Sequence, residues 1–61
     1  MPVITVDLAV LPDREAKEKL VKSLTSAAST STGIPENKFI VLINEMGRDN
    51  IGVGGKLLSD K

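Results

Sequence analysis

The chain has 61 residues, with no cysteine, no histidine and a single aromatic residue, Phe39. These features exclude disulfides and a thiolate or imidazole metal site, and eight basic residues balanced by eight acidic ones disfavour nucleic acid as a partner. Because a chain of this length buries only about 60% of the surface that its unfolded form exposes, we expect one small domain, residues 1–61, stabilised by oligomerisation.

The segment from residue 2 to residue 10 is rich in β-branched side chains. Ile4, Val6 and Leu8 alternate with other residues, as in a strand with two distinct faces. The sequence therefore predicts a strand that starts at the very beginning of the chain.

A helix is predicted next, over residues 14–32. Asp13 can accept hydrogen bonds from the free amides at its start. Gly33 can adopt the left-handed conformation that ends a helix, Ile34 can make the accompanying apolar contact, and Pro35 prevents continuation. Both ends of this helix are therefore marked by local chemistry.

The predicted helix is amphipathic. Pairs of opposite charge at i,i+4, Glu15 with Lys19 and Glu18 with Lys22, indicate a solvated face. Apolar side chains recur at helical spacing on the face expected to pack, namely Ala16, Leu20, Leu24, Ala27 and Ala28.

A second strand is predicted for residues 38–46. Its continuous apolar run, residues 39–43, is typical of a parallel strand that is buried on both faces. Two such strands joined by a helix make a right-handed βαβ unit of the α/β class. One helix covers one face of a two-stranded sheet, so we expect a partner subunit to cover the other.

The last segment is rich in glycine, at positions 47, 52, 54 and 55, and predicts a turn and a C-terminal β-hairpin. A phosphate-binding loop is disfavoured, because Asn50 and Leu57 occupy positions where that motif needs glycine and a hydroxyl residue. No metal site is expected either, since the carboxylates at positions 7, 45 and 49 lie on separate elements without histidine or cysteine. Glu45 is interpreted instead as a structural partner at the strand end.

The order of these features resembles the 4-oxalocrotonate tautomerase superfamily. The resemblance rests on Pro2 directly after the initiating methionine, on Asn-Glu-Met at residues 44–46 and on Ile-Gly-Val-Gly-Gly at residues 51–55. It covers nearly the whole chain. It implies the tautomerase fold, with βαβ protomers that pair into four-stranded sheets, and a homo-oligomer, a hexamer built as a trimer of dimers.

The resemblance also implies a role for Pro2. Removal of Met1 would convert its nitrogen to a secondary amine, and such a group can take a proton from an enol hydroxyl and return one to carbon. The expected activity is that of an isomerase, an enol–keto tautomerase acting on a small 2-hydroxy-dienoate or enol-pyruvate. Tautomerisation needs no cofactor, and none is expected.

The sequence departs from the family pattern in the substrate-binding positions. The resemblance places two arginines and an aromatic ring where this chain has Pro12, Ile40 and Ile51. The expected dicarboxylate clamps are therefore absent from those places. Ile40 and Ile51 remain candidates for an apolar pocket wall around the amine.

Three cations are candidates to replace the missing arginines: Lys38, Arg14 and Arg48. Lys38 is the first choice, because it lies two residues before Ile40 and would share its strand face. An ordinary solvated surface charge is the alternative for each of them.

Two further interpretations stay open. Loss of the arginines would also fit a non-catalytic oligomer of the same fold that binds a small ligand or a protein. Hydration or dehalogenation, known among the relatives, would need a water-activating carboxylate that the sequence does not identify. The sequence has no apolar run close to the ~20 residues of a membrane span, so we expect no membrane association. We also find no pattern of a signal segment and expect a cytoplasmic location.

Overall fold

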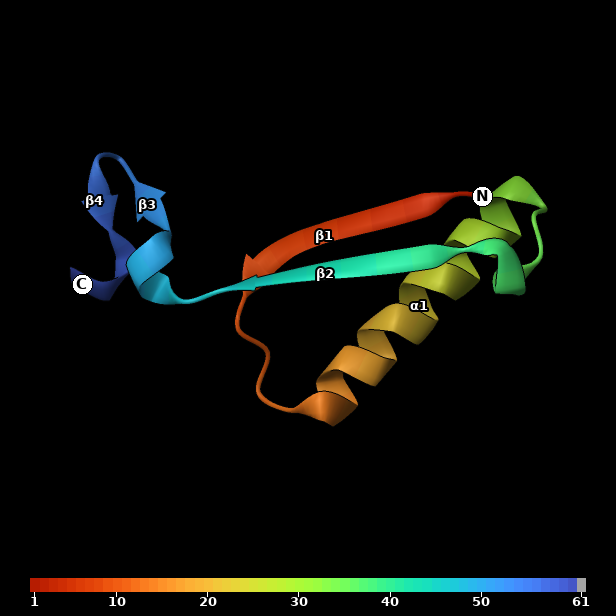
Figure 1. The fold of residues 1–61 in the computed structure, drawn as a ribbon, viewed down its shortest axis with the longest axis horizontal. Helices are drawn as coiled ribbons and strands as arrows, with labels where there is room; N and C mark the ends of the chain where they lie inside the picture. The colour runs from red at the N-terminus through yellow and green to blue at the C-terminus, as the bar shows by residue number, and fades with distance from the viewer. Residues whose placement is uncertain (61) are drawn as a thin grey trace.

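The computed structural model describes residues 1–60 and shows an α/β fold with a C-terminal hairpin (Figure 1). This arrangement confirms the βαβ prediction. Short 3₁₀ turns connect the larger elements at Glu36–Lys38 and Arg48–Asn50, and a third, Leu58–Asp60, follows the last strand. The larger elements are β1 (Val3–Ala9), α1 (Arg14–Thr32), β2 (Ile40–Met46), β3 (Gly52–Val53) and β4 (Lys56–Leu57).

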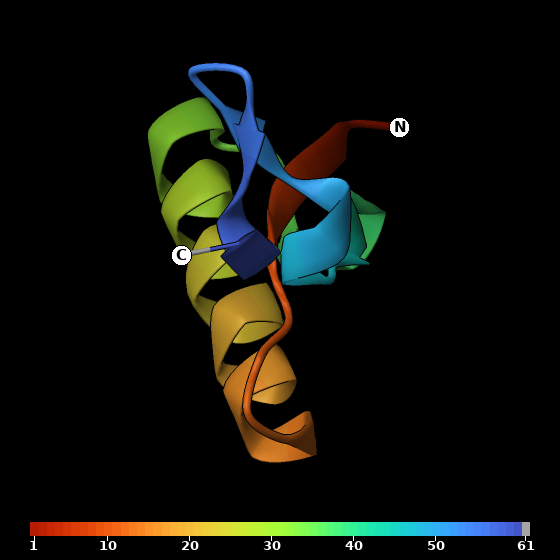
Figure 2. The ribbon, with the colours of Figure 1, turned by 90° about the vertical axis from the view of Figure 1, so that its left-hand side faces the viewer.

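β1 and β2 form a parallel pair in which Val3 lies opposite Ile40 and Ala9 opposite Met46. The crossover between them is α1, and Figures 1 and 2 show it on one side of the strands. Because the helix runs back against the direction of the strands, its last turn returns the chain to the end of the sheet where β1 begins (Figure 1). Pro2 and residues 34–40 therefore meet at one end of the molecule.

Both strands are shorter than predicted, and the prediction that Lys38 belongs to β2 is wrong. The peptide N–H of Lys38 donates to the Pro35 carbonyl at 3.1 Å, and that of Phe39 donates to the Glu36 carbonyl at 3.2 Å. These bonds close a 3₁₀ turn, so the strand begins only at Ile40. Strand alternation therefore does not relate Lys38 to Ile40.

The helix begins and ends as predicted. Asp13 Oδ1 accepts a hydrogen bond from the Ala16 amide at 2.8 Å. Gly33 has φ 78°, and its N–H donates to the Ser29 carbonyl at 2.9 Å. Within residues 1–60, no helix has the length and apolar character needed to cross a membrane.

The packed face of α1 differs at one predicted position. Ala27 is exposed, and Val21 is half-buried in addition to the predicted leucines. Among residues 1–60, Glu18 pairs at 3.1 Å with Arg14, one turn before it, and not with the predicted partner Lys22, one turn after it. The guanidinium of an arginine has a longer reach than the ammonium of a lysine. The Glu18 carboxylate can therefore pair with its neighbour at i−4 as well as with its neighbour at i+4.

The two faces of the β1–β2 sheet are covered very unequally. Ile4, Val6 and Leu8 alternate as half-buried positions on the helix side. On the opposite side Val3 is 53% exposed, Leu42 50% and Met46 38%. No side chain of residues 1–60 is fully buried, so the single protomer lacks a closed core.

The C-terminal hairpin is closed by two glycines. Gly54 and Gly55 have φ of 62° and 84°, the left-handed values that a two-residue turn between antiparallel strands requires. The Leu58 amide donates to the Ile51 carbonyl at 2.9 Å and ties the last 3₁₀ turn to the start of the hairpin. This unit lies at the end of the molecule opposite the N-terminus (Figure 1).

Candidate active site

A cavity of about 450 Å³ lies at the end of the sheet where the chain begins. It is formed by the N-terminus, the loop that follows α1, the first 3₁₀ turn and the start of β2. Its lining residues are Met1, Pro2, Ile34, Asn37, Lys38, Phe39 and Ile40.

Pro2 is half-buried in this wall and is held by the sheet. Its carbonyl accepts a hydrogen bond from the Ile40 amide at 3.0 Å, which begins the pairing of β1 with β2. Its nitrogen is bonded to Met1, whose side chain is 89% exposed. Cleavage after such an exposed residue would leave the Pro2 amine fixed at the cavity.

The Ile34 wall is held by hydroxyl groups from the last turns of α1. Ser29 Oγ donates to the Ile34 carbonyl at 2.6 Å, and the Ile34 amide donates to Thr32 Oγ1 at 3.2 Å. The Thr32 hydroxyl also donates to the Ala28 carbonyl at 2.7 Å. These residues were not predicted from the sequence, although hydroxyl residues within one turn of a helix-ending glycine are a recognisable signal for such bonds.

Lys38 is the charged residue of the cavity lining. Its side chain is exposed, and no carboxylate of residues 1–60 lies within ion-pair distance of it. Its backbone, by contrast, is fixed by the 3₁₀ turn. The structure thus brings Pro2, Lys38 and Ile40 together at one cavity.

The other predicted binding residues lie away from this cavity in the protomer. Arg14 begins α1 and pairs with Glu18. Arg48 Nη2 donates to the Leu58 carbonyl at 3.1 Å, and Ile51 precedes β3 in the same C-terminal unit. Figure 1 shows that unit and the N-terminus at opposite ends of the molecule.

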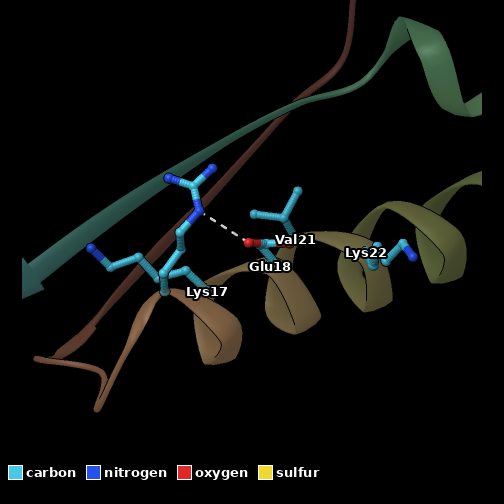
Figure 3. A pocket seen from close by; sticks show the side chains of 5 residues that line it. Lys17, Glu18, Val21 and Lys22 are labelled. Atoms are coloured by element: carbon cyan, nitrogen blue, oxygen red, sulfur yellow. Dashed lines mark hydrogen bonds and ion pairs between the residues drawn. The ribbon is translucent and has the colours of Figure 1, made fainter.

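A second cavity, of about 420 Å³, lies along the first half of α1. Lys17, Glu18, Val21 and Lys22 line it together with Arg14 (Figure 3). Glu18 and Arg14 are paired with each other, and no residue near the N-terminus reaches it. Its lining therefore does not include Pro2, which lines the first cavity.

Glu45 has a structural role, as the sequence analysis expected. Its Oε1 accepts from Lys17 Nζ at 2.7 Å, and its Oε2 accepts from the Leu11 amide at 2.8 Å. The Lys17 ammonium first, and the Leu11 amide second, hold the pKa of the Glu45 carboxyl below its usual value. These contacts anchor the loop between β1 and α1 to the end of β2.

Comparison with known proteins identifies the class of enzyme to which this architecture belongs. The family described as Tautomerase enzyme matches residues 2–61. A probable tautomerase of Bacillus cereus is 43% identical over 61 residues, which cover 100% of both chains. A 2-hydroxymuconate tautomerase of Bacillus subtilis is 42% identical over 60 residues, covering 98% of this chain and 97% of that protein.

A solved structure gives the same result. YwhB, a homologue of 4-oxalocrotonate tautomerase, is similar with a TM-score of 0.91 and 40% identity, over 98% of both chains. The chain belongs to the tautomerase family. This membership confirms the resemblance drawn from the sequence and supports tautomerase activity, that of an isomerase.

Proposed function

We propose that the protein is a cofactor-independent enol–keto tautomerase in which Pro2, once Met1 is removed, is the general acid–base. The observation that carries this proposal is the position of Pro2 in the wall of a cavity that is also lined by a cation, Lys38, which has no ion-pair partner among residues 1–60. The substrate is a small 2-hydroxy-dienoate or enol-pyruvate. A cytoplasmic location stays a prediction.

The reaction needs one group that can accept and donate a proton. The neutral amine of Pro2 takes the proton of the enol hydroxyl, and the electron pair of that O–H bond forms the carbonyl π bond. The electrons of the carbon–carbon double bond then take the proton back from the Pro2 ammonium at carbon. Proton and charge balance over the cycle, and the amine returns to its neutral form.

The lining of the cavity suits such an amine. Ile34, Phe39 and Ile40 give it an apolar wall, and Lys38 adds a positive charge. Both influences disfavour a second ammonium and therefore favour the neutral, proton-accepting form of the amine.

The assembly proposed with this function is a homo-oligomer, a hexamer built as a trimer of dimers. The bare sheet face with Val3, Leu42 and Met46 supports it, since the protomer has no other element to cover these side chains. Arg14, Arg48 and Ile51 lie far from Pro2 in one protomer, so they would contribute to substrate binding only from a neighbouring subunit.

The test is ketonisation of 2-hydroxymuconate and phenylenolpyruvate, followed by ultraviolet absorbance on protein whose intact mass shows that Met1 is absent. Replacing Pro2 by alanine should lower the rate by about 10²- to 10⁴-fold, the usual contribution of general acid–base catalysis. The same experiment with Ser23→Ala, an exposed helix position, is the control.

Full activity in Pro2→Ala protein would contradict the role of Pro2. Absence of turnover with both enols in processed wild-type protein would instead favour the non-catalytic binding protein as the alternative.

A further inference from the structure

We infer that Lys38 binds the substrate carboxylate and that, as the one charged side chain among the described residues that line its cavity, it makes this site prefer enols with one carboxylate over enols with two. The inference rests on the proposed function at Pro2 and specifies the substrate class of that site. It concerns a position outside the arginine pattern of the family, because Ile40 and Pro12 stand in those places.

The composition of the cavity carries the first step. Of the side chains that line it, Lys38 carries the positive charge and Asn37 supplies an amide. The remaining wall is formed by apolar side chains. One carboxylate can therefore find a charged partner, whereas a second would be desolvated against apolar groups without compensation.

Lys38 has an unpaired ammonium within the described residues and a fixed backbone. Within the described residues its ammonium has no carboxylate partner, so substrate binding would not first have to break an ion pair. Its backbone lies between two fixed points, the bond from its own amide to the Pro35 carbonyl and the bond from the Ile40 amide to the Pro2 carbonyl. The backbone of Lys38 is thus held in a constant position relative to Pro2.

Lysine and arginine bind carboxylates in different ways. Arginine grips a carboxylate with two parallel hydrogen bonds, whereas lysine acts as a point charge on a flexible stem. Both arginines of the chain have partners away from this cavity, Arg14 at Glu18 and Arg48 at the Leu58 carbonyl. The cavity of one protomer therefore offers one flexible contact and no second clamp, and an arginine of a neighbouring subunit would have to leave its own partner before it could supply one.

The kinetic test compares phenylenolpyruvate, a monocarboxylate, with 2-hydroxymuconate, a dicarboxylate, on Met1-processed protein. Wild-type protein should have the higher kcat/KM for the monocarboxylate. Lys38→Gln should raise the KM for the monocarboxylate about 10- to 100-fold with a smaller change in kcat, because one charge-assisted contact is lost. Lys38→Arg should restore most of the affinity, and Lys19→Gln, an exposed helix lysine, should match wild type.

A binding test separates this inference from the proposed function. The matched probes are 2-oxohexanoate and 2-oxohexanedioate, which differ by one carboxylate, titrated by NMR against wild-type, Lys38→Gln, Lys19→Gln and Pro2→Ala proteins. We expect the monoacid to bind at least as tightly as the diacid, and Lys38→Gln to weaken the monoacid about 10- to 100-fold. Pro2→Ala should keep this binding, so a failure of Pro2 in catalysis is visible separately.

Two results would overturn the inference. One is wild-type affinity for the monoacid in Lys38→Gln protein. The other is binding of the diacid more than about tenfold tighter than the monoacid, which would require a second cation at the site.

Discussion

The two faces of the β1–β2 sheet both carry apolar side chains but have very different surroundings. On the helix side, Ile4, Val6 and Leu8 are half-buried beneath α1. On the other side, Leu42 keeps half of its surface exposed. A parallel strand pair is apolar on both faces because it is built for two layers of cover, and this chain supplies only one of them. This difference supports the homo-oligomer proposed above, in which further copies of the protein would supply the second layer.

The largest expected effect comes from a charge on the bare face. Leu42→Asp should prevent assembly and unfold the protein at room temperature, because a buried, unpaired carboxylate costs several kcal/mol and the protomer lacks a closed core. Light scattering after size exclusion and circular dichroism measure the two consequences. Ala27→Asp, on the exposed side of α1, is the matched control and should remain an oligomer.

A fully folded oligomer in Leu42→Asp protein would show that this face is not covered by another subunit. The exposure of this sheet face would then not indicate a subunit interface.

A smaller effect is expected where the helix that covers the first face ends. Gly33 has φ 78° and open space around its Cα, so an alanine there meets no clash but must adopt a left-handed conformation. Gly33→Ala should lower the free energy of unfolding by about 1–2 kcal/mol. Chemical denaturation measures the change, with Ser23→Ala as the control within the helix. An unchanged midpoint would mean that the loop holding Ile34 does not depend on this cap.

The smallest effect is expected from Glu45, which ties the covered face to the loop after β1. Its pKa is lowered from an ordinary value of 4.5, so its contacts stabilise the fold above that pH and lose their effect as the pH falls through the lowered value. Glu45→Gln should therefore reduce the melting temperature near neutral pH, and the difference from wild type should shrink below about pH 4.5.

Thermal melts at several pH values follow this change, with Glu15→Gln on the solvated side of α1 as the control. A difference between wild type and Glu45→Gln that stays constant down to pH 3 would contradict the role of the Lys17–Glu45 pair.

The elements that the sequence predicted best are those defined by local chemistry. The helix over residues 14–32 agrees with the structure at both ends, because Asp13 and Gly33 act on amides and carbonyls within one turn of themselves. The hairpin was predicted from Gly54 and Gly55 for the same reason. The start of β2 was misplaced by two residues, because the hydrogen bonds of the Glu36–Lys38 turn compete with strand geometry and leave no clear pattern in the sequence.

The sequence by itself determined the βαβ order, the helix limits, the hairpin and Pro2 as the residue of interest. Only the tertiary structure decided which charged residues lie near Pro2. The parallel register sets the amide of Ile40 on the carbonyl of Pro2, and this pairing brings Lys38 to the cavity while Arg14 and Arg48 lie elsewhere. The physical reason is that strand pairing joins residues 38 positions apart through the packing of the intervening helix, and no local preference encodes such a contact.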